Sequence, residues 1–474
     1  MADRLSARET LALLTDDFTE LPAPARESEP DGPLAWQGYD AARARASERT
    51  GEDESVVCGT GRVEGTRAVL LAFEFGYLGG SLGVRTGDRL EAAYGYARAH
   101  RLPVVPLVAT GGSRMQEGML ALTQLQRVAR QSALTREAGL PQIAVLRDPT
   151  TGGGWATLGA GADIVLALPG AQIGFAGSRV RPPDADPTAY TAEAQVAAGA
   201  VDAVVRPESL RETLGRWLRL LTSPAPEAPL PRHPGPAAPS PATATDTGSP
   251  HTVRNPDPAP AEDARESSAP PLPRTGWEAV QWARSPQRPR ADRYLDTYFT
   301  HRVAISGDRC GGTDPGMLCG FGEHAGRTVA YAAQAGTATR PAGYRTAARL
   351  IRLADRLGIP VLTLVDTPGA ANDAEAERQG VGAAIADLFA ALATVRTPIT
   401  TLLIGEGGSG GALALAAPGN TWATPDSYFS VIAPEPAAAI LKRPPAAVTA
   451  TADQLRIRPQ DLAELGVIRT ADRG

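Results

Sequence analysis

The sequence predicts an α/β protein built from two similar blocks. Short apolar runs rich in β-branched residues alternate with longer stretches that carry apolar residues at helical spacing. Several of these runs end in glycine-rich turns, and the order of the parts is the same in both blocks. Strands that alternate with helices favour a sheet with right-handed crossovers. The repeat indicates a duplication, or a fusion of two once-separate subunits.

In the first block, expected over residues 1–221, a helix is predicted near the start, over residues 7–14. A helix over residues 88–100 precedes an apolar run, residues 102–108, that ends in Thr110-Gly111-Gly112. A long helix then reaches about residue 137. The next run, 140–146, leads into Asp148 and the turn at residues 152–154, after which a helix restarts. Residues 171–177 form the last run of this repeated series in the first block.

The second block, expected over residues 276–474, repeats this order. A helix over residues 344–357 precedes a run at 359–365, which ends in the DTPG turn at Asp366. A helix is predicted over 375–393. The run at 399–404 is expected to stop at Gly405, where the glycine-rich stretch 405–411 lets the backbone turn sharply before a helix restarts at Ala412. Residues 427–433 form the last run of the series in the second block.

Between the blocks, residues 222–275 are rich in proline, alanine and serine and lack apolar periodicity. Such a segment cannot bury enough apolar surface to fold. We therefore expect a disordered, flexible Pro-rich linker.

Composition excludes several classes of protein. The 474 residues suffice for two or three domains, and a net charge of −5 argues against nucleic acid as the main partner. Cys58, Cys310 and Cys319 form no CxxC pair, so we expect free thiols and no metal site. No stretch approaches a membrane span, and the start MADRLSARET lacks an apolar signal region. We expect a soluble, cytoplasmic protein with no membrane partner.

Four interpretations fit the stretch after residue 404. Gly407-x-Ser409-x-Gly411 matches a nucleophile elbow, but all five histidines precede Ser409, so a triad in the usual order is excluded. Gly405-x-Gly407-x-x-Gly410 matches a dinucleotide fingerprint, yet no acidic residue follows at the expected offset. An oxyanion hole made of glycine amides and a purely structural tight turn remain open.

Taken together, the motifs of both blocks resemble a known family. In the first block the matching stretches are RLSARE at 4–9, FEF at 73–75, GGSLG at 79–83, GGSRMQEG at 111–118, DPTTGG at 148–153 and GFAGSRV at 174–180. In the second they are ARSPQRP at 283–289, GDR at 307–309, GYR at 343–345, DTPGA at 366–370 and GEGGSGG at 405–411. The first block resembles the β, and the second the α, carboxyltransferase subunit of acetyl-CoA carboxylase.

This resemblance implies two crotonase-like ββα-spiral domains in tandem and a biotin-dependent acyl-CoA carboxyltransferase. A carboxyl group would pass from carboxybiotin, on a separate carrier protein, to acetyl-CoA, propionyl-CoA or another acyl-CoA, giving malonyl-CoA or a substituted malonyl-CoA. The chain departs from the separate bacterial β subunit in having no four-cysteine zinc ribbon. Pro436 also stands where the family typically has glycine, which removes a backbone donor.

The chemistry of this transfer needs stabilised oxyanions rather than a side-chain nucleophile. Negative charge develops on the thioester oxygen and on the ureido oxygen of biotin, and preorganised amides stabilise such charge. By resemblance, Gly152 and Gly153 serve the thioester side, and Gly410 and Gly411 the biotin side. The residues predicted to bind substrate are Gly111, Gly112, Arg114, Gln116, Tyr344, Arg345, Gly369 and Ala370. For Arg114, Gln116 and Arg345 a structural role is the alternative. Met115, Met119, Leu122 and Leu125 lie at helical spacing and are predicted core residues.

The expected partners follow from what the chain lacks. No Met-Lys-Met biotinylation site and no P-loop occur in it. The resemblance therefore implies a separate biotin carboxyl carrier protein, a separate biotin carboxylase, and a homodimer or higher homo-oligomer. Two alternatives remain: a malonyl-thioester decarboxylase of the same fold, and a non-catalytic carboxylase scaffold.

Overall fold

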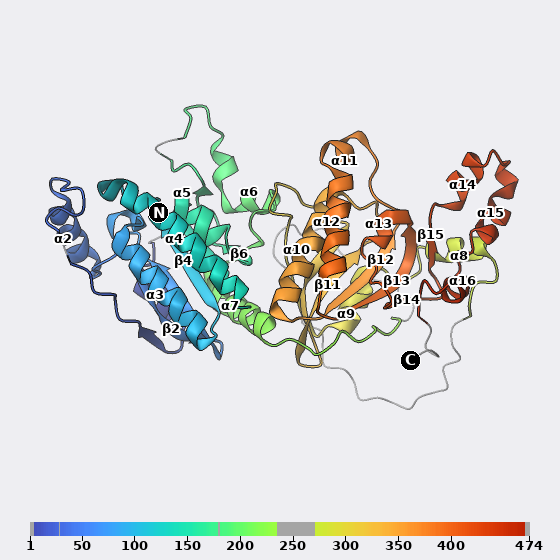
Figure 1. Cartoon of the computed structure of the whole chain (residues 1–474), viewed down its shortest axis with the longest axis horizontal. Helices are drawn as coiled ribbons and strands as arrows, with labels where there is room; N and C mark the ends of the chain where they lie inside the picture. Colours follow the sequence, from blue (N-terminus) through green and yellow to red (C-terminus); the bar gives the residue numbers. More distant parts are fainter. Residues whose placement is uncertain (1–3, 28, 179–180, 235–270, 470–474) are drawn as a thin grey trace. The chain divides into compact units, whose positions relative to one another are not determined.

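The computed structural model describes residues 4–27, 29–178, 181–234 and 271–469 (Figure 1). It divides into two compact units, Met1–Thr222 with Arg309–Gly312, and Ser223–Asp308 with Thr313–Gly474. Each unit has its own sheet with helices packed on it, which confirms the predicted α/β fold in two tandem domains. Residues 235–270 of the predicted linker lie outside the described residues. Every described helix is too short or too polar to cross a lipid bilayer.

The first unit contains, in chain order, α1 (Ala7–Leu14), β1 (Phe18–Glu20), α2 (Tyr39–Thr50), β2 (Val56–Val63), β3 (Thr66–Phe73), η1 (Leu78–Gly80), α3 (Val84–His100), β4 (Val104–Thr110), η2 (Met115–Glu117), α4 (Gly118–Glu137), β5 (Ile143–Thr151), α5 (Gly152–Gly154), η3 (Trp155–Gly159), β6 (Ile164–Ala167), β7 (Ile173–Gly174), η4 (Pro187–Tyr190), α6 (Ala192–Ala197), β8 (Ala203–Val204) and α7 (Pro207–Thr222). Its sheet has the order β1-β2-β3-β4-β5-β6-β8, with β7 paired to the far end of β5. The strands β1 to β3 are antiparallel, and those from β3 onwards are parallel.

The second unit contains α8 (Gly276–Ala283), α9 (Ala291–Tyr298), β9 (His301–Ala304), β10 (Met317–His324), β11 (Arg327–Gln334), α10 (Pro341–Leu357), β12 (Val361–Thr367), α11 (Ala374–Arg378), α12 (Val381–Thr394), β13 (Ile399–Gly408), α13 (Ser409–Leu413), β14 (Thr421–Ala423), β15 (Tyr428–Ser430), α14 (Pro434–Ile440), η5 (Pro445–Ala447), α15 (Val448–Gln454) and α16 (Pro459–Glu464). Its sheet has the order β14-β13-β12-β11-β10-β9, with β15 paired to the far end of β13. A hairpin, a crossover helix and parallel strands therefore recur in both units.

Local sequence explains several helix ends. Ser6 caps α1, and Glu9 completes a capping box. Pro341 begins α10, and Gly358 ends it in the left-handed conformation. The single helix predicted over residues 375–393 is wrong: Gly380, with a φ of +75°, separates α11 from α12. The central strands β4 and β12 are buried along their whole length, as expected for strands covered on both faces.

The two strands that lead to the candidate site are longer than predicted. β5 continues to Thr151 and β13 to Gly408, beyond the expected ends at residues 146 and 404. The pairing of β5 with β4, and of β13 with β12, shifts register partway. The last residues of β5 and β13 also pair with β7 and β15, respectively. The glycine stretch after Gly405 is therefore a continuation of the strand, and the sharp turn comes only at Ser409, where φ is +57°.

Residues 223–234, at the start of the predicted linker, pack against the second unit. The N–H of Ala225 donates to the carbonyl of Thr328 at 2.9 Å, and Ala225 and Ala228 are buried in the apolar core of this unit. The Nε2 atom of His233 lies 3.5 Å from Oδ2 of Asp426. Sequence composition missed these contacts because single alanines among prolines carry no periodic signal.

Candidate active site

In the first unit, β4 ends in a glycine turn whose backbone is held on both sides. The N–H of Gly111 donates to the carbonyl of Gly79 at 2.9 Å, and the N–H of Gly112 donates to Thr110 Oγ1 at 3.0 Å. The carbonyl of Gly112 accepts from the N–H of Leu82 at 2.9 Å. Gly112 has a φ of +113°, which only glycine adopts readily. Backbone hydrogen bonds and the Thr110 hydroxyl therefore hold this turn.

The second turn of this unit lies where β5 runs into α5. Gly152 has a φ of +64°, and a Cβ atom there would lie 3.2 Å from the Cα of Gly112, so the two turns touch. The N–H of Gly152 donates to the carbonyl of Phe175 at 3.1 Å. The amide of Gly152 therefore already has a hydrogen-bond partner within the protein. Gly153 is the next amide at the helix start, where the helix itself supplies no carbonyl partner.

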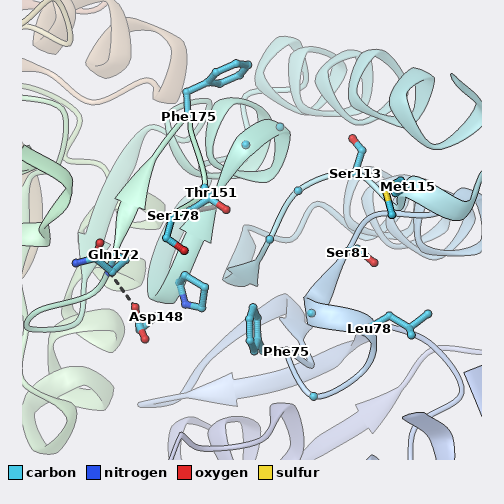
Figure 2. Close-up of a pocket in the computed structure, with 18 of the residues that line it drawn as sticks. Phe75, Leu78, Ser81, Ser113, Met115, Asp148, Thr151, Gln172, Phe175 and Ser178 are labelled. Carbon is cyan, nitrogen blue, oxygen red and sulfur yellow. Dashed lines mark hydrogen bonds between the residues drawn. The ribbon is translucent and has the colours of Figure 1, made fainter. Parts of the chain in front are cut away.

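The two turns line one cavity of about 980 Å³. Among its lining residues are five of the predicted ones, Gly111, Gly112, Gln116, Gly152 and Gly153. Figure 2 shows the cavity, with Ser113 and Met115 on one side of it and Gln172 and Ser178 on the other. These five residues therefore lie together around one cavity, and their roles stay a prediction.

Arg114 does not line this cavity, contrary to the prediction. Its side chain is only 1% exposed and forms ion pairs with Glu54 at 2.5 Å and with Glu117 at 3.4 Å. Burial alone would raise the pKa of the Glu54 carboxyl, but the charge of Arg114 lowers that pKa to about 2. The N–H of Arg114 donates to the carbonyl of Leu82 at 2.9 Å. Arg114 therefore stabilises the glycine turn from the protein interior. This agrees with the structural role that was the alternative to substrate binding for this residue.

Other cavity residues were not predicted to bind substrate. The cavity is also lined by Arg4, Arg49, Phe75, Asp148 and Gln172. Three of them lie in stretches that carried the family resemblance, but no spacing rule connects residue 4 with residue 148. Their proximity depends on the packing of α1 against the sheet, which the sequence did not reveal. Similarly, Met115 and Met119 are exposed rather than in the core, with exposed fractions of 68% and 67%.

The second unit repeats the first turn. The N–H of Gly369 donates to Thr367 Oγ1 at 3.1 Å, and its φ is +140°. Its carbonyl accepts from the N–H of Thr339 at 3.1 Å. Ala370 forms a parallel bridge with Thr339, just as Ser113 does with Leu82 in the first unit. The predicted residues Gly369 and Ala370 therefore occupy the positions equivalent to Gly112 and Ser113.

Gly410 and Gly411 differ sharply in their surroundings. Gly411 is buried, and a Cβ atom there would lie 2.4 Å from the backbone nitrogen of Ala370. Gly410 is exposed, with nothing within 4 Å of its Cβ position. By its place in the strand–helix junction, Gly410 corresponds to Gly153 of the first unit. Gly411 therefore packs the two turns together, and Gly410 presents its face to solvent.

Tyr344 and Arg345 are also held within the protein. The hydroxyl of Tyr344 is buried and donates to the carbonyl of Gly411 at 3.2 Å. Arg345 donates to Asp308 at 2.7 Å and to the carbonyl of Gln379 at 3.1 Å. These contacts favour a structural role for both side chains, and their assignment to substrate binding stays a prediction. Tyr344 supports the glycine turn, and Arg345 forms the ion pair that was its structural alternative.

A buried carboxylate holds the extended part of β13 in place. Asp366 is paired with Arg288 at 2.6 Å and with Arg290 at 3.2 Å, and it accepts from the N–H of Glu406 at 3.1 Å. It lies at the register shift between β12 and β13. These contacts of Asp366 therefore hold β13 in place beyond the register shift. They help to position Gly410, which follows the end of the strand.

The structure leaves the nucleophile-elbow interpretation without a base. Ser409 does sit between a strand and a helix, with a left-handed φ. However, His233 lies against Asp426 and His324 contacts the carbonyl of Tyr298, and among the described residues no histidine is hydrogen-bonded to Ser409. The described residues also contain no group of three His, Cys, Asp or Glu side chains placed to hold a metal ion, and none of their three cysteines forms a disulfide.

Comparison with protein families matches both units. Residues 35–204 match the carboxyl transferase domain, and residues 272–471 match the acetyl co-enzyme A carboxylase carboxyltransferase-like family. The chain is 40% identical to the acetyl-coenzyme A carboxylase carboxyl transferase subunits beta/alpha of Salinispora arenicola, over 98% of this chain and 81% of that protein. It is 35% identical to a probable biotin-dependent acyl-coenzyme A carboxylase beta3 subunit of Mycobacterium tuberculosis, over 94% and 85% of the two chains.

Solved structures agree on the fold. The transcarboxylase 12S structure superimposes with a TM-score of 0.74 at 20% identity, covering 98% of this chain and 86% of that one. A single-chain long-chain acyl-CoA carboxylase gives a TM-score of 0.68 at 19% identity, covering 98% and 45%. Because the sequence matches span both units at up to 40% identity, the chain belongs to the acetyl-CoA carboxylase carboxyltransferase family, with its beta-like and alpha-like parts in one polypeptide.

Proposed function

We propose that this protein transfers a carboxyl group from carboxybiotin to an acyl-CoA, with acetyl-CoA and propionyl-CoA as the first substrates to test. The observation that carries the proposal is the duplicated site. In each unit two glycine turns touch, and an amide follows at the start of a short helix. In the first unit these turns line a cavity of about 980 Å³, a size suited to a ligand much larger than a single amino acid.

The first unit, residues 1–221, is proposed to bind the acyl-CoA. Gly153 donates its N–H to the thioester oxygen as negative charge develops there, and Gly152 shapes the turn. Gly111, Gly112 and Gln116 line the same cavity and bind the thioester end. Preorganised amides suit this chemistry because they need not reorient as the charge forms.

The second unit, residues 276–474, is proposed to receive biotin, which supplies the carboxyl group from a separate carrier protein. Gly410 fits this role because it is exposed and has open space beside it. The carbonyl of Gly411 accepts from Tyr344 and from Gln334, each at 3.2 Å, so the turn beneath Gly410 is rigid. Gly369 and Ala370 belong to the neighbouring turn, which packs against Gly411. A separate biotin carboxylase charges the carrier.

A second copy of this chain is proposed to cover both sites. Both units expose large apolar side chains: Phe175 and Met115 line the cavity of the first unit, and Val431 and Ile440 lie in the second, with exposed fractions of 74%, 68%, 74% and 70%. Covering such side chains is favourable and excludes water from the developing charges. Sedimentation equilibrium should therefore give a homodimer or larger assembly, and a monomer at micromolar concentration would contradict this part.

The test of the proposed function is a carboxyl-transfer assay with the full chain, acetyl-CoA or propionyl-CoA, a biotinylated carrier protein, and a biotin carboxylase supplied with ATP and radiolabelled bicarbonate. Label should appear in the malonyl-CoA or substituted malonyl-CoA product. CO₂ release from malonyl-CoA without any biotin would instead identify a decarboxylase. No transfer and no decarboxylation by a folded, assembled protein would identify a scaffold.

A further inference from the structure

The N-terminal segment of the chain is pinned to one side of the cavity by buried groups. Arg147 is 4% exposed, and its guanidinium donates to the carbonyls of Phe73, at 3.0 Å, and of Leu5. Glu74 accepts from the N–H of Ala7 at 2.8 Å. These bonds fix the backbone immediately after Arg4. The position of Arg4 is therefore built into the fold.

The Arg4 side chain reaches into the cavity. Its guanidinium carbon lies 4.4 Å from the ring centre of Phe75, and its Nη2 is 2.8 Å from Asp148 Oδ2. All three residues line the cavity, and Arg4 and Asp148 are 43% and 45% exposed. A guanidinium has five N–H donors, so one ion pair leaves others available. The aromatic ring holds the planar group flat without using those donors.

A second cation lies on the same side. Arg49 donates to the carbonyl of Gly76, the residue after Phe75, at 2.5 Å, and it also lines the cavity. In Figure 2, Phe75 and Asp148 lie towards the lower edge of the cavity, whereas Phe175 and Ser113 lie towards the upper edge. Two arginines therefore lie beside Phe75, whereas Arg181, which also lines the cavity, donates to Gln172 at 3.0 Å.

We propose that Arg4 binds a phosphate group of the acyl-CoA, and that Asp148 holds it in place until the nucleotide arrives. This inference rests on the proposed function. Acetyl-CoA carries its permanent negative charge on its phosphates and none on its acyl end, so a cation in the cavity matches the phosphate end. Guanidinium and phosphate form paired, charge-assisted hydrogen bonds. Asp148 lowers affinity by competing for the same donors.

The experiment measures equilibrium binding of CoA and of pantetheine to the full chain by calorimetry, alongside carboxyl transfer. Arg4→Gln should weaken CoA binding about tenfold and leave pantetheine binding unchanged. Asp148→Asn keeps an oxygen for the N–H of Gln172, which now donates to Asp148 at 3.0 Å, and should tighten CoA binding severalfold. In the double variant this gain should disappear, because Arg4 is the group that Asp148 restrains.

Arg8→Gln is the matched control. Arg8 lies on α1, pairs with Glu52 and Glu20 and does not line the cavity, so its loss removes the same charge from the same region. Its CoA affinity should equal that of the wild type. Equal CoA binding by Arg4→Gln and wild type, or equal losses for CoA and pantetheine, would overturn the proposal while leaving the carboxyltransferase function intact. Failure of the wild type to bind CoA at all would overturn both.

Discussion

Replacing Gly410 with alanine separates the chemical role of the glycine turn from its structural role. The Cβ position of Gly410 has no atom within 4 Å, and its φ is not left-handed. The alanine therefore fits without any shift of the protein. Because alanine restricts the unfolded chain more than glycine does, we expect the free energy of unfolding to stay the same or rise by about 0.4–1 kcal/mol.

The same methyl group should reduce carboxyl transfer strongly. The methyl carbon is bonded to the Cα, next to the backbone nitrogen that is the proposed donor. It therefore crowds any oxygen that is hydrogen-bonded to that N–H. Losing one such donor costs roughly 2.7–4 kcal/mol in the barrier, so we expect a fall of about 10²-fold or more in kcat. Stability and activity should thus change in opposite directions, which a general folding defect cannot produce.

Gly382→Ala is the matched control for this experiment. Gly382 is also exposed, also has nothing within 4 Å of its Cβ position, and also lies in the first turn of a helix of the second unit, α12. Thermal unfolding and transfer rates should be measured for both variants. Wild-type transfer by Gly410→Ala, with its stability kept, would refute the assignment of the amide.

Three further predictions concern stability. Gly411→Ala places a Cβ atom 2.4 Å from a backbone nitrogen, so urea unfolding should show a loss of about 1–3 kcal/mol, and an unchanged midpoint would contradict the packing. Arg114→Met leaves the buried Glu54 carboxylate unpaired and should cost about 3–5 kcal/mol, whereas a loss below 1 kcal/mol would show that the network relaxes. The hydrogen bond to Asp426 raises the pKa of His233 above its usual 6.5, so this contact stabilises the fold fully below that pH and less as the pH rises through the higher folded value. His233→Gln should remove that part of the pH dependence of unfolding, and an identical pH profile would argue against the contact.

Much of this architecture could be predicted from the sequence because its signals are local. Apolar runs, helix caps and glycine turns are set by neighbouring residues, which is why β4, α4, α10 and β12 were found close to their true positions. The turns at Gly112 and Gly369 were recognisable because positive φ angles require glycine. The hairpins β2–β3 and β10–β11 were not predicted, and the ends of β5 and β13 were placed too early. Pairing partners, not local composition, decide where those strands stop.

The sequence by itself determined the two-block α/β organisation, the glycine turns and the family, because each depends on residue types at short spacing. The tertiary structure alone decided which amides and charges face the cavity. Arg114 and Arg4 both lie in motifs that carried the family resemblance, yet one is buried behind the turn and the other lines the cavity. That difference arises from contacts between residues more than fifty positions apart, such as Arg114 with Glu54 and Arg4 with Asp148. Such long-range contacts exist only once the sheet has brought those segments together.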